Sequence, residues 1–264
     1  MLRIVFVVAA MATLALQARA QQPFYTDDAD VAEYHRWHLE SSDEVDALPQ
    51  SVAPSFRQNT WTIKFSYGLF HNCEIGMDFP LLTIYNSTPD PVKTPFGLGD
   101  TDYSIKYNFH QEHEGSKWPA ITASLNIEPP TGDVRLKLGS GLIDYYLNGI
   151  VQKTVSPKNV LRFNAGATFA GNTLTGVVGI STRGTVFTGG TSLTHQFTSK
   201  FDLGMEVYGG YTANTGLAAR GELQQQIGGN YELSKGLTLD FGFITGQATG
   251  SPRRGVLVGF SKDF

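Results

Sequence analysis

Cysteine is almost absent from this sequence, because Cys73 is the only one among 264 residues. A single thiol excludes an internal disulfide framework and a cysteine-rich zinc module. An excess of basic charge is also missing, since 20 lysines and arginines stand against 24 acids, for a net charge of −4. Nucleic-acid-binding proteins usually carry an obvious basic footprint, so we expect no nucleic-acid partner.

Long apolar runs are missing beyond the first twenty residues, where nothing approaches the ~18 residues of a membrane-spanning helix. The first twenty residues have the three parts of a secretory signal peptide. Arg3 supplies the positive start, Ile4 to Leu16 form the apolar stretch, and Ala18-Arg19-Ala20 precede the cleavage point. We therefore predict a signal peptide over residues 1–20 and one exported domain over residues 21–264.

The sequence is rich in alternating apolar and polar positions. From Trp61 to Leu69 every odd residue is apolar, while Lys64 and Ser66 are among the even ones. A period of two indicates a strand with one apolar and one polar face. Similar alternation recurs over 31–42, 72–80, 102–109, 121–128, 138–155, 161–169, 186–197, 201–208, 221–233, 237–247 and 255–264. This makes about twelve strands, of which 138–155 is irregular because Leu142 and Ile150 are out of phase.

Alternation alone does not separate a soluble sandwich from a membrane barrel, which turns its apolar face outward to lipid. Three features favour the barrel. Connections alternate between short ones, such as 156–159 and 198–200, and long ones, such as 43–57, 81–97 and 170–185. Aromatic residues gather near both predicted ends of the strands, as they do at membrane interfaces. The last strand alternates up to a C-terminal aromatic residue, Phe264.

These features predict an all-β fold: a transmembrane, antiparallel, up-and-down β-barrel of about 12 strands in the bacterial outer membrane. The sheet has to close, because lipid cannot satisfy the hydrogen bonds of an open edge. We expect membrane lipid as one partner and the outer-membrane barrel assembly machinery, reading Phe264, as another. The long connections would be extracellular, and residues 21–30 would form a short periplasmic lead-in.

Four short motifs carry a family resemblance. They are Pro23 to Asp28, Tyr34 to Trp37, Phe96 to Thr101 and Pro129 to Asp133. With them the chain resembles the outer-membrane transporter-like family named for a meta-pathway of phenol degradation. The resemblance implies an outer-membrane barrel, distantly related to channels for fatty acids and aromatic compounds. It supplies no catalytic residues.

Three groups of residues could carry chemistry. His110 to His113 could hold a metal ion, Asp27 to Asp30 could bind calcium, and His195 could act as the base of a barrel hydrolase. The first two lack further ligands at suitable spacing, and no serine on a sharp turn accompanies the third. A solvated turn, a solvated acidic segment and a structural histidine are the favoured interpretations. We expect no enzyme activity, no catalytic residue, no metal and no cofactor.

The polar positions of the strands would face the lumen, where acids outnumber bases by eleven to four on this phasing. The candidate lumen residues are Arg36, Lys64, Lys106, Asp100, Asp102, Glu128, Arg162 and Glu206. An unpaired acidic excess would disfavour small anions, whereas acids paired across strands would only stabilise the barrel. Twelve strands leave a narrow interior that side chains can fill.

The resemblance and the predicted barrel together imply passive passage of small, hydrophobic or aromatic molecules. Two alternatives remain open. One is a structural or adhesion barrel with a plugged lumen. The other is a barrel hydrolase, which would need His195 or His110 within hydrogen-bond reach of a serine.

Overall fold

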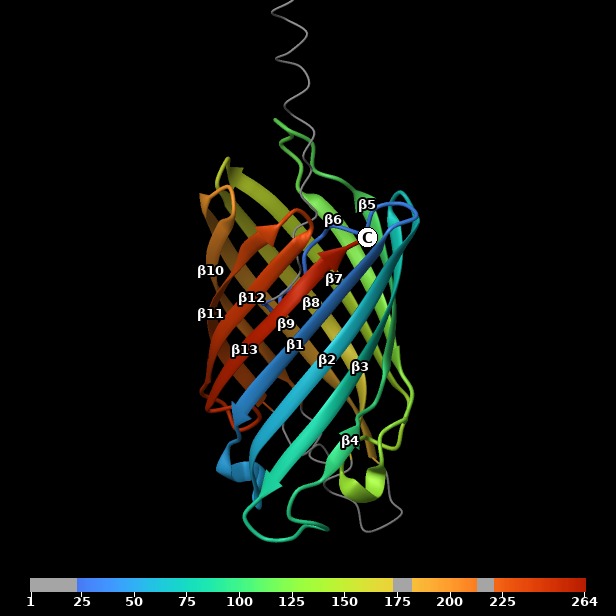
Figure 1. Cartoon of the computed structure of the whole chain (residues 1–264). Helices are drawn as coiled ribbons and strands as arrows, with labels where there is room; N and C mark the ends of the chain where they lie inside the picture. Colours follow the sequence, from blue (N-terminus) through green and yellow to red (C-terminus); the bar gives the residue numbers. More distant parts are fainter. Residues whose placement is uncertain (1–22, 173–181, 213–220) are drawn as a thin grey trace, which may run out of the picture.

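A computed structural model describes residues 23–172, 182–212 and 221–264, and in it the strands wind around one central axis (Figure 1). The predicted signal peptide and part of the predicted connection 170–185 lie outside the described residues. Among the described residues, no helix has the length and hydropathy needed to cross a membrane.

The sheet consists of twelve long strands and one short one. The long strands are β1 (Trp37–Ala47), β2 (Ser55–Phe70), β3 (Cys73–Asn86), β5 (Asp102–His110), β6 (Ala120–Glu128), β7 (Asp144–Ser156), β8 (Asn159–Asn172), β9 (Thr182–Thr198), β10 (Phe201–Tyr211), β11 (Gly221–Ser234), β12 (Leu237–Gly246) and β13 (Arg254–Asp263). The short strand is β4 (Phe96–Leu98), and two single-turn 3₁₀ helices are η1 (Gln50–Val52) and η2 (Val134–Leu136).

Antiparallel pairing runs around the whole sheet and closes it. Each long strand pairs with the next long strand along the chain, and β1 pairs with β13 from His38 opposite Asp263 to Ala47 opposite Arg254. Strand β4 adds only three residues beside Leu81 to Thr83 of β3. The predicted twelve-stranded up-and-down barrel is confirmed.

The first predicted strand is displaced in the structure. The sequence predicts 31–42, whereas β1 spans Trp37–Ala47, and β2 and β3 extend beyond their predicted ends to Ser55 and Asn86. Backbone pairing between Ser55 and Asn86 continues the ladder past the apolar alternation that marked the strands. The connections 43–57 and 81–97 are therefore shorter than predicted.

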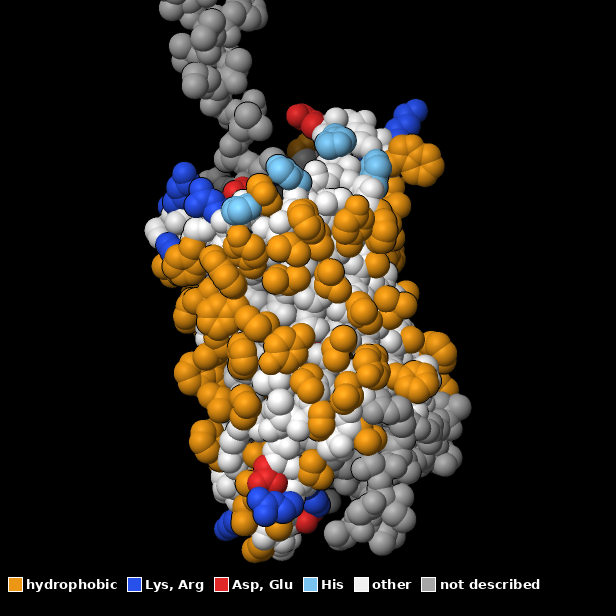
Figure 2. Space-filling view, turned by 90° about the vertical axis from the view of Figure 1, so that its right-hand side faces the viewer, with side chains coloured by type: hydrophobic (Ala, Val, Ile, Leu, Met, Phe, Trp, Pro, Cys, Tyr) orange, Lys and Arg blue, Asp and Glu red, His pale blue; other side chains and the backbone are white. Residues whose placement is uncertain are grey.

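The two faces of the wall follow the predicted phase. Phe163 and Met205 are 50% and 61% exposed on the outside, whereas Asn164 and Glu206, their neighbours in sequence, are buried toward the lumen. Hydrophobic side chains cover the middle of the outer surface in Figure 2, and charged side chains gather at its two ends. This is the surface that a barrel presents to lipid.

The ends of the barrel differ in their connections. Two-residue turns at 71–72, 157–158, 199–200 and 235–236 lie at one end, together with the start of β1 and the end of β13. We call this the short-turn end. The opposite end, the long-loop end, carries the connection 129–143 and the segment around β4.

Candidate functional site: the lumen and its N-terminal segment

Residues 23–33, which we call the lumen segment, lie inside the barrel (Figure 1). The Glu206 carboxylate accepts hydrogen bonds from the backbone N–H groups of Tyr25, at 3.1 Å, and Thr26. The Gln226 side chain donates to the Pro23 carbonyl at 2.6 Å. The prediction of a periplasmic lead-in over residues 21–30 is therefore wrong for the described part. Inward polar side chains supply the hydrogen bonds that this extended backbone requires.

An ionic contact anchors the segment. Lys106 Nζ on β5 lies 3.0 Å from Asp27 Oδ1 and 3.0 Å from Asp28 Oδ1, and the side chains of Lys106 and Asp28 are buried. The interpretation of Asp27 to Asp30 as a solvated acidic segment is therefore wrong at Asp28. A buried lysine needs a countercharge, and the segment provides it.

An apolar contact holds the next residue of the segment. Ala29 is fully buried in a cluster with Ala120 and Ile150, and its carbonyl accepts hydrogen bonds from Asn108 at 2.8 Å and Thr122 at 2.6 Å. Ile150 is one of the two residues that broke the alternation of the predicted strand 138–155. It lies in the inward phase of β7 with Asn148, and an apolar side chain is accommodated there because Ala29 packs on it.

Inward glycines make room for the start of the segment. A Cβ atom at Gly190 would lie 2.8 Å from Thr26 Oγ1, one at Gly204 would lie 3.0 Å from Phe24 Cζ, and one at Gly228 would lie 2.6 Å from Pro23 Cγ. Real Cβ contacts are rarely this short, so a side chain at Gly190 would displace the segment. At Gly204 and Gly228 a side chain would press on the segment and also on a backbone oxygen of the neighbouring strand, 2.6 Å away. Glycines in the inward phase of β9 to β11 were the available sequence signal for it.

Two of the predicted lumen bases have polar partners on neighbouring strands. Lys64 on β2 stands opposite Glu40 on β1 and Asp78 on β3 in the strand register. Arg162 is buried and donates to Gln152 at 2.8 Å. The lumen therefore brings bases and acids together.

The remaining candidates lie toward the ends of the barrel. Asp102 accepts a hydrogen bond from Asn126 at 2.7 Å, and Glu128 ends β6 at the long-loop end. Arg36 is exposed and precedes β1 at the short-turn end, outside the strands.

Asp100 ties two of the sequence motifs together. Its carboxylate accepts hydrogen bonds from the backbone N–H groups of Gly132, at 2.8 Å, and Ser140, at 2.6 Å. Beside it, the Thr101 N–H donates to Thr131 Oγ1 at 2.8 Å. The motif Phe96 to Thr101 thus fixes the motif Pro129 to Asp133, and Asp100 orders the connection 129–143.

The histidines considered as catalytic or metal-binding have local partners. His110 Nδ1 lies 2.9 Å from the Pro119 carbonyl oxygen, and His195 Nδ1 lies 2.8 Å from Asn159 Oδ1. Within residues 23–172, 182–212 and 221–264, no three His, Cys, Asp or Glu side chains are grouped to hold a metal ion.

Tyrosines line the part of the lumen that lies toward the long-loop end. Tyr25 stacks on Tyr208 of β10, with ring centroids 5.6 Å apart and planes at 27°. Tyr146 of β7 accepts a hydrogen bond from Thr188 of β9 at 3.3 Å. Tyr146 and Tyr208 occupy the inward phase of their strands, which was the sequence signal for them.

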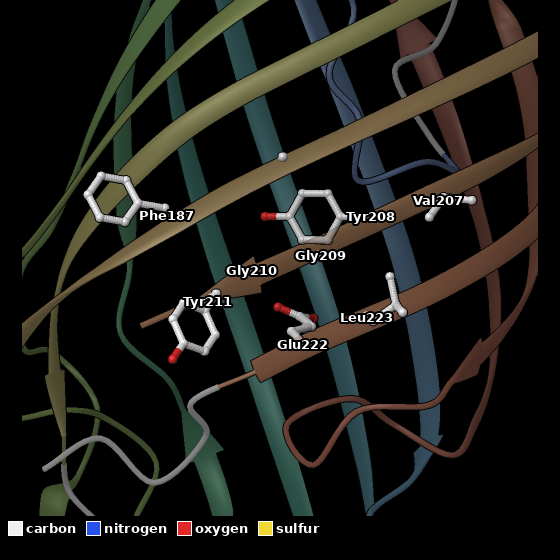
Figure 3. A pocket seen from close by; sticks show the side chains of 9 residues that line it. Phe187, Val207, Tyr208, Gly209, Gly210, Tyr211, Glu222 and Leu223 are labelled. Carbon is white, nitrogen blue, oxygen red and sulfur yellow. The ribbon is translucent and has the colours of Figure 1, made fainter. Parts of the chain in front are cut away.

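A hollow of about 350 Å³ lies in the wall nearby, where β9, β10 and β11 meet (Figure 3). Gly189 and Gly209 pair directly across β9 and β10, so the wall carries no side chain at this point. Outward Phe187, Tyr211 and Leu223 line the hollow, and Tyr208 and Glu222 also belong to its lining.

Comparisons with known proteins agree with this architecture. A family model described as "Putative MetA-pathway of phenol degradation" matches residues 56–264. A search of curated proteins finds no match. Among solved structures, the COG4313 outer membrane channel from Pseudomonas putida F1 is similar, with a TM-score of 0.68 at 12% identity over 90% of this chain and 98% of that one.

Two porins share the fold at lower similarity. The NanC porin has a TM-score of 0.58 at 9% identity over 86% of this chain and 98% of its own. The KdgM porin has a TM-score of 0.53 at 10% identity over 86% of this chain and 99% of its own. At these identities the likeness establishes the fold, and the chain is an outer-membrane β-barrel.

Proposed function

We propose that this chain, which belongs to the phenol-degradation family matched over residues 56–264, passes small hydrophobic or aromatic molecules across the outer membrane. The observation that carries the proposal is the occupied lumen. The lumen segment crosses the interior and is held by Glu206, Lys106 and Gln226, so a wide aqueous pore is not available. Small molecules fit such a passage better than large hydrophilic ones.

The passage we propose is passive. Molecules would move down their concentration gradient beside the lumen segment, where tyrosines supply apolar surface within a polar wall. Movement of this kind needs no cofactor, and we assign none. The related COG4313 protein is itself described as an outer membrane channel.

We also propose an orientation and two partners. The short-turn end faces the periplasm and the long-loop end faces outside, as is usual for outer-membrane barrels. Membrane lipid surrounds the apolar outer face. The barrel assembly machinery recognises Phe264, whose side chain is exposed. The backbone N–H of Phe264 donates a hydrogen bond to the Trp37 carbonyl at 3.0 Å.

Uptake of a hydrophobic dye tests the proposal. Cells that express the barrel should take up N-phenylnaphthylamine faster than cells carrying an empty vector. Leakage of a periplasmic enzyme, measured in parallel, serves as the control for a damaged outer membrane. Equal uptake with a correctly inserted barrel would contradict the proposed passage.

A structural barrel with a plugged lumen is the second candidate, and the lumen segment is the observation that favours it. The same dye experiment separates the two, because a permanently sealed barrel predicts no uptake above the vector. For catalysis we propose no role. The Nδ1 atoms of His195 and His110 lie beside Asn159 and the Pro119 carbonyl, in the positions expected of structural histidines.

A further inference from the structure

Tyr25 of the lumen segment places a phenol ring, its own side chain, inside the barrel. Its ring stacks on Tyr208 at 5.6 Å, and its hydroxyl donates a hydrogen bond to Glu44 Oε1 of β1 at 2.5 Å. The residue nevertheless remains 42% exposed, so it stands in open space in the lumen. The wall therefore already shows how it holds a phenolic group.

The wall beneath these rings is shaped for them. A Cβ atom at Gly190 would lie 2.9 Å from Tyr208 Cδ2, and one at Gly166 would lie 2.7 Å from Tyr146 Cε2. Both tyrosine rings therefore lie close against a glycine of the neighbouring strand. Rings held in this way present apolar faces to the lumen, and such faces stack well with another aromatic ring.

The hydroxyl of Tyr25 lies among carboxylates. Asp46 and Glu222 act on it electrostatically in addition to Glu44. Asp46 Oδ1 is buried and has no hydrogen-bond donor among the described residues. A neutral hydroxyl that enters this place can donate a charge-assisted hydrogen bond.

We propose that Tyr208, Tyr146 and Glu44 form a binding site for neutral phenolic compounds, which Tyr25 of the lumen segment occupies in their absence. An incoming phenol displaces the Tyr25 side chain, stacks on Tyr208 and donates a hydrogen bond from its hydroxyl to the Glu44 carboxylate. The inference deepens the proposed function, on which it rests for the class of molecule that reaches the lumen. It adds the chemistry that selects among such molecules.

The contacts of Tyr25 discriminate between ligand classes. An aromatic hydrocarbon can stack but leaves the carboxylate without its donor. An aromatic carboxylate such as benzoate is repelled by the carboxylates of Glu44 and Glu222. A saturated alcohol can donate a hydrogen bond but cannot stack.

Binding to the Tyr25→Ala barrel tests the proposal, because this change removes the competing ring and leaves the wall intact. Barrels in lipid nanodiscs are dialysed to equilibrium against radiolabelled phenol, with empty nanodiscs as the background. We expect Tyr25→Ala to bind phenol about tenfold more tightly than the unchanged protein, since stacking and a hydrogen bond to a charge no longer have to be displaced.

Two further variants in the Tyr25→Ala background locate the site. Tyr208→Leu removes the stacking surface and Glu44→Gln removes the charged acceptor. Each should therefore abolish the gain in phenol affinity that Tyr25→Ala produces. Tyr145→Leu is the matched control, because Tyr145 is exposed on the outer face of β7, next to Tyr146 in sequence, and its replacement should leave binding unchanged. The heat-dependent gel shift of folded barrels confirms that every variant has folded.

A series of four ligands tests the specificity of the proposed site for phenols. Phenol should bind Tyr25→Ala, whereas anisole, cyclohexanol and benzoate should bind at least about tenfold more weakly. Equal binding of phenol and anisole, retention of phenol binding after Tyr208→Leu, or no gain from Tyr25→Ala would each overturn the proposed site. These binding measurements are made at equilibrium and do not depend on transport. Failure of the proposed binding site can therefore be distinguished from failure of the proposed passage, which dye uptake tests.

Discussion

Lys106 Nζ lies 3.0 Å from Asp28 Oδ1, and this contact joins the middle of a membrane strand to a segment that precedes the barrel in sequence. Both side chains are buried. Removing one partner of a buried ion pair leaves an uncompensated charge at a cost of about 3–5 kcal/mol. Movement of the segment out of the lumen would return the Asp27 and Asp28 carboxylates to water and remove this cost.

Lys106→Met should therefore release the lumen segment. We expect the single-channel conductance in planar bilayers to rise several-fold. In a Cys73→Ser background, a cysteine introduced by Ala29→Cys should become reactive toward a membrane-impermeant maleimide. Lys158→Met, at an exposed two-residue turn, is the control that should leave both quantities unchanged. An unchanged conductance in folded Lys106→Met barrels would contradict the anchoring role.

Gly190→Val should displace the segment by volume alone. A Cβ atom at Gly190 would meet Thr26 Oγ1 at 2.8 Å and Tyr208 Cδ2 at 2.9 Å. At the adjacent position Gly189, on the outer face, the nearest atom would be 3.4 Å away, so Gly189→Val is a matched control. We expect raised conductance only for Gly190→Val, and equal conductance for the two variants would show that the glycine does not seat the segment.

Asp100→Ala should loosen the connection 129–143 without changing ion selectivity. The carboxylate accepts two backbone hydrogen bonds there, from Gly132 and Ser140, and each buried donor left unsatisfied costs about 1–3 kcal/mol. Limited proteolysis should cut this connection faster than in Asp133→Ala, because the Asp133 carboxylate bonds locally to Arg135 of η2. A shifted reversal potential with unchanged proteolysis would instead make Asp100 a residue of the ion path.

Glu112 should contribute a pH-dependent stabilisation at the short-turn end. Burial raises the pKa of Glu112, but hydrogen bonds from Lys153 and from the Thr154 N–H outweigh it and hold the pKa below its usual value of 4.5. Because the folded pKa is lowered, the stabilisation is complete above pH 4.5 and is lost as the pH falls through the folded pKa.

The change Glu112→Gln measures this contribution. Its cost in urea unfolding should be about 0.2–1 kcal/mol at pH 7 and should shrink in strongly acidic buffer. Glu114→Gln, in the same turn, is exposed and serves as the control. A Glu112→Gln cost that does not depend on pH would refute the ionic origin of the stabilisation.

Much of the wall could be predicted from residues taken one at a time. Phe163 and Asn164 are neighbours whose opposite polarity alone assigns them to lipid and lumen, and the structure agrees. Such assignments succeed because the strand period places successive side chains on opposite faces whatever their distant partners are. The strand number follows from the same pattern.

The content of the lumen could not be predicted in this way. Ile150 looked like an irregularity, and Asp28 looked like part of a solvated run, yet the first packs on Ala29 and the second pairs with Lys106. Their partners lie 121 and 78 residues away in sequence. No local pattern marks contacts across that separation.

The sequence by itself determined the class of the fold, the phase of its strands and its place in a membrane. The first two follow from the period of two in the strands, and the third follows from the apolar outer face that this period predicts, which lipid covers. The tertiary structure alone decided that Tyr25 stacks on Tyr208 and that the Asp100 carboxylate accepts hydrogen bonds from the connection 129–143. Closure of the sheet surrounds the lumen segment with charges and glycines from many strands, and its place depends on all of them together.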